Sequence, residues 1–369
     1  SLLSGTAIPI RMALCGAGGD SGGARCGVAG GRREGLLRPG IEARRGDHCD
    51  GGGHCVGYCG SVEIQQGEEC EDGGGEIVGI SAGGSHTLAL ELDGTLHWWG
   101  TSSYAQPPQD VLFKQVSGGR SHSCGVDLDG NVHCWGINNG NNWDYGQVTL
   151  APTEGKFTYV SAGYVHSCAI KEDGTVLCWG AGSLETPTDD QKTFIKGQVT
   201  LTPTEPVFRQ IGTGHGHTCG LKKDGSLACW GGSSGINNVP TGAGFVSLSV
   251  GYHHNCALTS GGAMTCWGWK NFGLVEDMPG GTFQSVACGY THACAVRTNG
   301  EVACWGVPNG TLNEEKFDHG QATDAPLNPD FKLVGVDDSH SCAVTTDDKV
   351  MCWGSNTINK LTPPAELQP

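Results

Sequence analysis

Short runs of alternating hydrophobic and polar residues recur along most of this chain. In most runs, two stretches of about five residues flank an Asp-Gly, Asn-Gly or Gly-Gly pair, as in SCAIKEDGTVLCWG at residues 167–180. Alternation with a period of two residues is typical of β-strands, and these dipeptides are typical of the tight turns that join them. Each run therefore predicts a β-hairpin, and helical periodicity is scarce throughout.

The hairpin occurs seven times with the same internal spacing. Each copy begins at a histidine and reaches a Trp-Gly pair without any insertion; the histidines are His86, His122, His166, His217, His254, His292 and His340, and the tryptophans are Trp99, Trp135, Trp179, Trp230, Trp267, Trp305 and Trp353. A further strand-like run, such as FTYVSAG, precedes each hairpin, and the linker after Trp-Gly can supply a fourth strand. Units of ~40 residues with about four strands are what a propeller blade needs. The pattern predicts an all-β, seven-bladed β-propeller over residues 76–369.

Six of the seven hairpins carry two cysteines ten residues apart. If the turn of the quoted hairpin is a three-residue loop with Gly174 in the left-handed conformation, Cys168 lies directly opposite Cys178. Directly opposed residues have Cα atoms ~4.5 to 5.5 Å apart, within reach of a disulfide. The first hairpin lacks both cysteines at once and has Leu88 and Trp98 in their places, which a direct cross-strand contact predicts.

Zinc is the alternative use for these cysteines, but each hairpin would then need two further ligands from elsewhere. We therefore expect six disulfides: Cys124–Cys134, Cys168–Cys178, Cys219–Cys229, Cys256–Cys266, Cys294–Cys304 and Cys342–Cys352. Cys288 aligns with small residues of the other units and is expected to be a free thiol packed in the core.

Composition points to the outside of a cell. Nineteen cysteines in 369 residues are typical of an oxidising compartment. The formal charge of −16 argues against a broad face for nucleic acid or anionic membrane, and no run approaches the length of a membrane span. Asn309 opens an Asn-Gly-Thr acceptor for N-glycosylation in a predicted loop. We expect an extracellular, secreted or cell-surface protein.

Residues 1–75 differ from the rest of the chain. They contain long Gly-rich stretches and have too few apolar residues to form a core by themselves. Their six cysteines, which allow fifteen connectivities, are Cys15, Cys26, Cys49, Cys55, Cys59 and Cys70. A metal could use Cys49, His54, Cys55 and Cys59, but an oxidising setting favours disulfides. We expect a disulfide-rich, Gly-rich irregular N-terminal arm.

The repeat is similar to that of a known family. The run [VI]-S-x-G-x-x-H-[ST]-C, ending in C-W-G, resembles the repeat of the regulator of chromosome condensation family, whose fold is a seven-bladed propeller. YGQVTLAPTEGKFTYV, at residues 145–160, resembles the family's inter-blade stretch. The variant with two cysteines looks like that of the extracellular members, such as the ectodomains of Crinkly-type plant receptor kinases. The resemblance covers roughly residues 76–360.

A second resemblance lies upstream. CGSVEIQQGEECEDGG, at residues 59–74, is similar to the Myxococcus cysteine-rich repeat, a module of surface and secreted proteins, although Ser61, Val62 and Glu71 depart from its pattern. The best-known activity of the propeller family is nucleotide exchange on a nuclear small GTPase. We do not expect it here, because hairpins built for disulfides do not suit the nucleus and the acidic charge does not suit chromatin.

The repeated histidines and tryptophans predict structural roles. A catalytic histidine is needed once, whereas a histidine in every blade is expected to tie its strand to a neighbouring backbone. The linkers are more informative, because those after Trp135, Trp179 and Trp305 are long and two of them are adjacent. Candidate ligand-binding residues in the linkers are Asn141, Trp143, Asp144, Tyr145 and Trp269. Aromatic residues beside Asn and Asp suit contacts with sugar or protein, and capping of blade edges is the alternative.

No catalytic motif stands out: the sequence has no G-x-S-x-G, H-E-x-x-H, P-loop or dinucleotide fingerprint. We therefore expect no enzyme, no cofactor and no metal, but an extracellular protein-binding or scaffold module of a surface or matrix assembly. One alternative is a lectin-like carbohydrate binder, which predicts that Trp143, Tyr145 or Trp269 is exposed beside polar loops. The other is a secreted enzyme, which predicts a polar cluster with perturbed protonation in the central channel or a loop cleft.

Overall fold

The computed structural model describes residues 75–101, 106–183, 189–192, 194–232, 234–307, 318–327 and 330–369, and the backbone of three short strands in the N-terminal arm. The chain divides into two compact units, residues 8–76 and a unit containing Ile77–Pro369. In the first, β1 (His48–Cys49), β2 (Cys55–Cys59) and β3 (Val62–Ile64) form an antiparallel sheet. The pairing of the six N-terminal cysteines, the metal alternative there and the acceptor Asn309 all fall outside the described residues.

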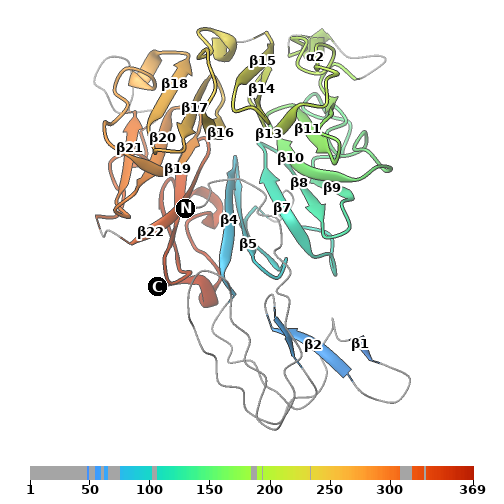
Figure 1. Ribbon diagram of the computed structural model, residues 1–369, viewed down its shortest axis with the longest axis vertical. Helices are drawn as coiled ribbons and strands as arrows, with labels where there is room; N and C mark the ends of the chain where they lie inside the picture. The colour runs from blue at the N-terminus through green and yellow to red at the C-terminus, as the bar shows by residue number, and fades with distance from the viewer. Residues whose placement is uncertain are drawn as a thin grey trace. The chain divides into compact units, whose positions relative to one another are not determined.

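Seven three-stranded antiparallel sheets form the second unit, as predicted for a seven-bladed propeller (Figure 1). In chain order, blades 1 to 7 are β4 (Ile77–Gly83), β5 (His86–Glu91) and β6 (Leu96–Gly100); β7 (Phe113–Gly118), β8 (His122–Asp127) and β9 (Val132–Gly136); β10 (Phe157–Ala162), β11 (His166–Lys171) and β12 (Val176–Gly180); β13 (Phe208–Thr213), β14 (His217–Lys222) and β15 (Leu227–Gly231); β16 (Phe245–Val250), β17 (His254–Thr259) and β18 (Met264–Gly268); β19 (Phe283–Cys288), β20 (His292–Arg297) and β21 (Val302–Gly306); and β22 (Phe331–Val336), β23 (His340–Thr345) and β24 (Val350–Gly354).

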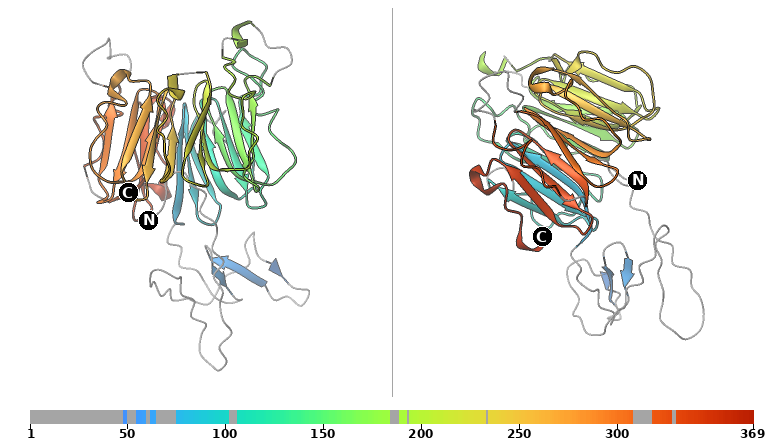
Figure 2. Two further views of the ribbon diagram at one scale, coloured as in Figure 1. Left: turned by 45° about the horizontal axis from the view of Figure 1, so that its top comes forward. Right: turned by 90° about the vertical axis from the view of Figure 1, so that its left-hand side faces the viewer.

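The described parts of the linkers do not add the fourth strand that the sequence allows. Within the described residues they form turns and short helices, because glycine and proline interrupt them. The helices are α2 (Asp189–Lys192), η1 (Ser234–Ile236), η2 (Asn271–Gly273), η4 (Thr357–Asn359) and η5 (Ala365–Leu367). The blades stand side by side, with α2 beyond the ends of the strands (Figure 2).

The hairpins have the predicted register. In blade 3, Gly174 adopts a left-handed φ of 96°, and Cys168 pairs with Cys178 across the ladder. All six predicted disulfides are present, with Cα–Cα distances of 4.0 to 4.1 Å, shorter than the separation expected from an ordinary strand pair. In blade 1, Leu88 faces Trp98 as expected, and Cys288 is a buried free cysteine.

The repeated histidines join neighbouring blades, which confirms their structural role. Each is fully buried, and six share a side-chain hydrogen bond with the residue that follows the histidine of the next blade. The bonds, of 2.6 to 2.9 Å, are His86–Ser123, His122–Ser167, His166–Thr218, His217–Asn255, His292–Ser341 and His340–Thr87. Their partners are side chains and not the backbone groups that the repeat led us to expect. The seventh, His254, has no partner among the described residues, because blade 6 offers Ala293.

The C-terminal tail closes the ring. The indole of Trp179 donates to the carbonyl of Gln147 in the preceding linker at 2.8 Å, and several other repeated tryptophans make the same contact. For blade 1 the acceptor is Lys360 in the tail, at 2.9 Å from the Trp99 indole nitrogen. Leu367 then packs in the core with Ile77 of β4. The tail therefore serves as the linker that precedes blade 1, and the described contacts that close the ring are non-covalent.

Candidate binding face

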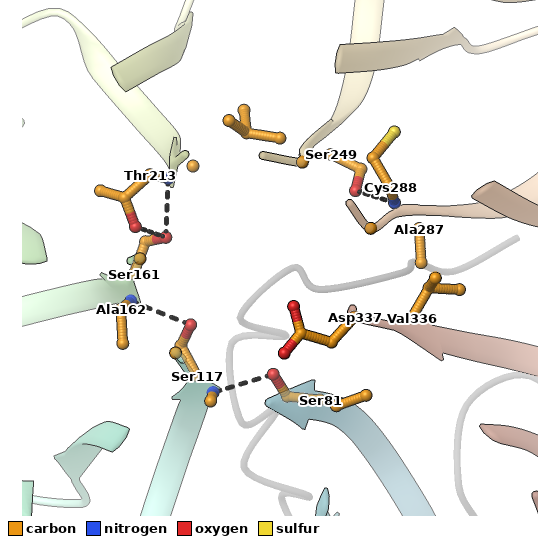
Figure 3. A pocket seen from close by; sticks show the side chains of 18 of the residues that line it. Ser81, Ser117, Ser161, Ala162, Thr213, Ser249, Ala287, Cys288, Val336 and Asp337 are labelled. Carbon is orange, nitrogen blue, oxygen red and sulfur yellow. Dashed lines mark hydrogen bonds between the residues drawn. The ribbon is translucent and has the colours of Figure 1, made fainter. Parts of the chain in front are cut away.

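The first strands of the seven blades line a central channel with a cavity of about 180 Å³. Serines near the ends of these strands bridge neighbouring blades (Figure 3). The hydroxyls of Ser81, Ser117, Ser161 and Ser249 each accept a hydrogen bond of 2.9 or 3.0 Å from a backbone N–H of the following blade. The other three blades carry Gly212, Ala287 and Gly335 at this position and cannot make the contact. The channel wall is therefore regular, but not uniform.

One mouth of the channel is formed by the turns between the first and second strands of each blade. Six turns begin with glycine, at Gly83, Gly119, Gly163, Gly214, Gly251 and Gly289. A Cβ atom at any of these glycines would lie 2.3 to 2.9 Å from a backbone oxygen in the turn of the next blade. Real side chains do not approach backbone this closely, so neighbouring turns can meet only through glycine. The residue after the glycine is free to vary.

These variable residues give the mouth its chemistry. In blade order they are Gly84, Arg120, Tyr164, His215, Tyr252, Tyr290 and Asp338. Tyr252 contacts three of its neighbours, with ring centroids 4.9 Å from Tyr164, 4.3 Å from His215 and 4.4 Å from Tyr290. Aromatic side chains from four consecutive blades therefore pack together beside the channel.

The adjacent long linkers of blades 2 and 3 extend this packing on one side. Trp143 lies 5.5 Å from Phe194 and 5.9 Å from Tyr164, measured between ring centroids. The two linkers also bond to each other, since the amide of Gln191 donates to the carbonyl of Asp144 at 2.8 Å. The two adjacent long linkers therefore build up one side of this face.

On the other side the packing reaches the linker of blade 5. His253 lies 4.4 Å from Tyr252 and 5.3 Å from Trp269, and Trp269 lies 5.5 Å from Phe272. A continuous series of ring contacts therefore joins Trp143 to Trp269, although they lie 126 positions apart in the sequence. We call this set the aromatic cluster: Trp143, Tyr164, Phe194, His215, Tyr252, His253, Trp269, Phe272 and Tyr290.

The five candidate residues from the sequence occupy different places. Trp143 is 43% exposed, whereas Trp269 is half-buried. Tyr145 is fully buried and packs edge-on against Phe194, at 6.1 Å between ring centroids. Asn141 is exposed, but its side-chain oxygen accepts a hydrogen bond from the backbone N–H of Trp143 at 2.8 Å. Both carboxylate oxygens of Asp144 accept bonds from backbone N–H groups of its own linker.

Arg120 is the cation of the aromatic cluster. Its guanidinium carbon lies 4.2 Å from the ring centroid of Tyr164 and 5.5 Å from that of Trp143, within the range of cation–π attraction. It also donates a hydrogen bond to the Tyr164 hydroxyl. Burial, followed by neighbouring positive charge, lowers the pKa of His215 to about 3, so this imidazole is neutral at physiological pH.

Two carboxylates face the channel from the turn of blade 7. Burial and then repulsion from Asp338 raise the pKa of Asp337 well above its usual value, and burial raises the pKa of Asp338. Lys360 is buried nearby and donates to the hydroxyl of Ser339 at 2.8 Å. This polar cluster is of the kind that the enzyme alternative requires. Within the described residues, however, neither carboxylate shares a hydrogen bond with a serine, cysteine or histidine side chain that could act as a nucleophile.

Sequence reasoning missed the turn residues: Arg120, Tyr164, His215, Tyr252, Tyr290, Asp337 and Asp338. Two signals in the sequence could have found them. The two positions between the repeated glycine and histidine vary from blade to blade, reading GS, RS, YV, HG, YH, YT and DS. In blade 7, Asp337 also replaces the glycine. Variation at a fixed place in a strict repeat marks positions that the fold does not dictate.

The family model of the regulator of chromosome condensation (RCC1) repeat matches residues 77–106, 113–147, 157–184, 245–273, 283–310 and 338–357. The chain therefore carries repeats of the RCC1 family. Blade 4, from Phe208 to Gly231, lies outside the matched segments but has the same sheet order as the matched repeats and the hairpin disulfide that five of those six carry.

Solved structures show the same fold. The ectodomain of the Physcomitrella patens receptor kinase CR4 is 24% identical with a TM-score of 0.56, over 75% of this chain and 72% of that one. The CRINKLY WD40 ectodomain of the Arabidopsis thaliana receptor kinase ACR4 is 22% identical with a TM-score of 0.58, over 77% and 97%. Prp20p of Saccharomyces cerevisiae, studied for binding to Gsp1p and histones, is 19% identical with a TM-score of 0.52, over 70% and 80%. A comparison with curated proteins gives no match.

The described residues contain no helix with the length and apolar character needed to span a membrane. The same residues contain no group of three His, Cys, Asp or Glu side chains placed to hold a metal ion.

Proposed function

We propose that the protein is an extracellular protein-binding module whose partner docks on the aromatic cluster. The observation that carries this proposal is the unbroken series of ring contacts from Trp143 to Trp269, with Trp143 43% exposed at one end. Tyrosine, tryptophan and arginine are enriched at the centres of protein interfaces, and a few such residues supply most of the binding energy. Arg120 and Trp143 combine these residue types at one place.

Two features support an extracellular setting. The propeller has six disulfides. Disulfides persist in oxidising compartments and are rare in the cytosol and nucleus. Two structures with the same fold are ectodomains of plant receptor kinases. These features also argue against carrying over the Gsp1p and histone binding studied for Prp20p.

The same geometry favours a protein partner over a carbohydrate. A sugar-binding site needs an open aromatic face with free polar groups beside it. The polar groups beside Trp143 are already used, because Asn141 and Asp144 bond to the backbone of their own linker. Tyr145 is buried, and Arg120 lies near the ring of Trp143.

Selection of displayed random peptides on the oxidised full chain tests the proposal. We expect the selected peptides to lose affinity by about tenfold or more on the Trp143→Ala variant, as hot-spot residues do. Leu177→Ala is the matched control, because Leu177 is 38% exposed on the outer strand β12 and lies outside the aromatic cluster. Peptides that bind both variants like the unaltered chain would refute the proposal. A glycan-array signal that disappears with Trp143→Ala would establish the lectin alternative instead.

A further inference from the structure

Asp337 breaks the rule that the other six blades obey. It stands where they carry the first glycine of the turn, the position at which a Cβ atom would collide with the next blade. Backbone hydrogen bonds between neighbouring turns run from blade 1 to blade 6, beginning with Gly84 N–H to the Gly119 carbonyl and ending with Tyr252 N–H to the Gly289 carbonyl. Blade 7 thus introduces a side chain where the repeat otherwise excludes one.

The carboxylate of Asp337 points into the channel (Figure 3). Its Oδ2 atom is buried and has no hydrogen-bond partner within the part of the chain that the structure describes. A buried carboxylate oxygen without a donor is costly, and such groups normally have a partner. The channel beside it has a cavity of about 180 Å³ that can hold one.

In the described part of the chain, the cations beside Asp337 do not supply that partner. Arg120 is directed to Tyr164 and Trp143, and the ammonium of Lys360 donates to Ser339. No ion pair within 4.0 Å joins either cation to Asp337 or Asp338 among the described residues. Both cations lower the pKa of Asp337, yet burial and Asp338 outweigh them. The mouth therefore has room for additional positive charge.

The walls of the cavity suit a cation on an apolar stem. Tyr164 and Tyr252 line it together with Asp337 and Asp338. Tyrosine rings attract cations through their faces and pack against methylene groups through the same surface. The whole chain carries 38 acidic and 22 basic residues, so its field also draws a basic partner toward it.

We propose that the channel mouth binds the ammonium group of a lysine side chain presented by the protein partner, with Asp337 as its charge partner and Tyr164 and Tyr252 flanking its stem. The inference rests on the proposed function, which it deepens by naming what the partner inserts. Among the described residues, the charges that act on Asp337 are Asp338, Arg120 and Lys360, and those that act on Asp338 include Arg120 and Lys360, so a bound ammonium favours the ionised forms of both carboxyls.

The experiment uses two probes that differ in one charge. N-acetyl-lysine N-methylamide and N-acetyl-norleucine N-methylamide are titrated into the oxidised full chain at low salt, and heat is measured. We expect the lysine probe to bind at least about tenfold more tightly, because a charge-assisted hydrogen bond is worth more than 1.4 kcal/mol. Asp337→Asn removes the charge at equal size, and Asp337→Gly restores the turn of the other six blades. Both should remove the preference for lysine.

Asp347→Asn is the control, since Asp347 is exposed in the hairpin of the same blade and bonds to Thr345. Equal binding of the two probes, or a preference for lysine that persists in folded Asp337→Asn and Asp337→Gly, would overturn the inference. The peptide selection separates this failure from that of the proposed function. If the selected peptides lose affinity on Trp143→Ala but not on the Asp337 variants, the protein-binding function stands and the lysine pocket is refuted. If the lysine probe binds but no selected peptide depends on Trp143, the lysine pocket stands and the proposed docking of a protein partner is refuted.

Discussion

His254 offers a test of the histidine contacts by gain of stability. It is fully buried, and neither ring nitrogen has a partner in the described structure. The next blade presents Ala293 where the other blades present a serine, threonine or asparagine. Replacing Ala293 with serine should supply the missing contact, because serine hydroxyls at this position lie 2.6 to 2.8 Å from Nε2 of the histidines that they contact. A hydroxyl can donate or accept, so Nε2 of His254 could bond it in either tautomer, while Nδ1 would stay unpaired as it is in five of the other repeated histidines.

The expected gain follows from the energy of buried polar groups. A typical hydrogen bond adds about 0.5 to 1.5 kcal/mol, and leaving a buried group unpaired costs about 1 to 3 kcal/mol. Burial of the new hydroxyl offsets part of this gain. We therefore expect Ala293→Ser to raise the free energy of unfolding by about 1 kcal/mol. Denaturant titration of the oxidised protein, followed by tryptophan fluorescence, measures the shift as a higher midpoint at unchanged slope.

A second substitution in the same strand provides the control. Ala295 is also fully buried and lies two residues further along β20, where no unpaired histidine faces it. Ala295→Ser should therefore destabilise the fold by about 1 to 3 kcal/mol. If Ala293→Ser destabilises the chain as much as Ala295→Ser does, His254 does not need a partner. The histidine contacts would then be a by-product of packing rather than a source of stability.

Burial and cross-linking lead to three further predictions. Burial lowers the pKa of the seven repeated histidines, in six of them to about 3 or 4, so these side chains stay neutral in the folded protein but bind protons in the unfolded chain below about pH 6.5. The free energy of unfolding should therefore fall by at least about 2 kcal/mol from pH 7.5 to 5. Denaturant titrations at the two pH values measure this change, and a constant midpoint would contradict these pKa values. Burial raises the pKa of Cys288 to about 12, so peptide mapping after iodoacetamide treatment should find it unmodified until the chain unfolds, and modification under native conditions would show that the core opens. Cys168→Leu with Cys178→Trp introduces the pair that blade 1 uses, so the fold should be kept. Loss of the cross-link should lower the free energy of unfolding by about 2 to 3 kcal/mol. An unchanged value would show that the disulfide adds nothing to stability.

The blades could be predicted because one spacing determines several features together. The alternation of apolar residues sets which face of the hairpin is buried, and the turn sets which residues oppose each other. A slip of one residue would place Cys168 and Cys178 on opposite faces, so the disulfide and the apolar pattern agree on a single register. The paired absence of cysteine in blade 1 is an independent indication of the same register. Closure of the ring was harder, because the contact between Trp99 and Lys360 joins residues 261 positions apart.

The binding face could be predicted only in part. Trp143 and Trp269 stand out in the sequence because they lie in linkers, where the repeat does not explain them. Their connection does not stand out, because it passes through Tyr164 and Tyr252, which occupy turns of ordinary length inside the repeat. Those turns come together only when the blades form a ring. A residue that lies ~40 positions from its neighbour in the chain becomes adjacent to it around the channel.

Departures from the repeat are therefore the informative positions, and their surroundings decide what they mean. Ala293 differs from the serine, threonine or asparagine at the same position of the other blades, and it is buried between two blades. The group left without a partner is His254 of the same chain, so the consequence is a loss of stability. Asp337 differs from the glycines at the same position of the other blades, and its carboxylate points into the cavity of the channel. Both differences leave a polar atom without a partner among the described residues. Only the second residue lines a cavity, which is why a binding site is inferred at Asp337 and a stability defect at His254.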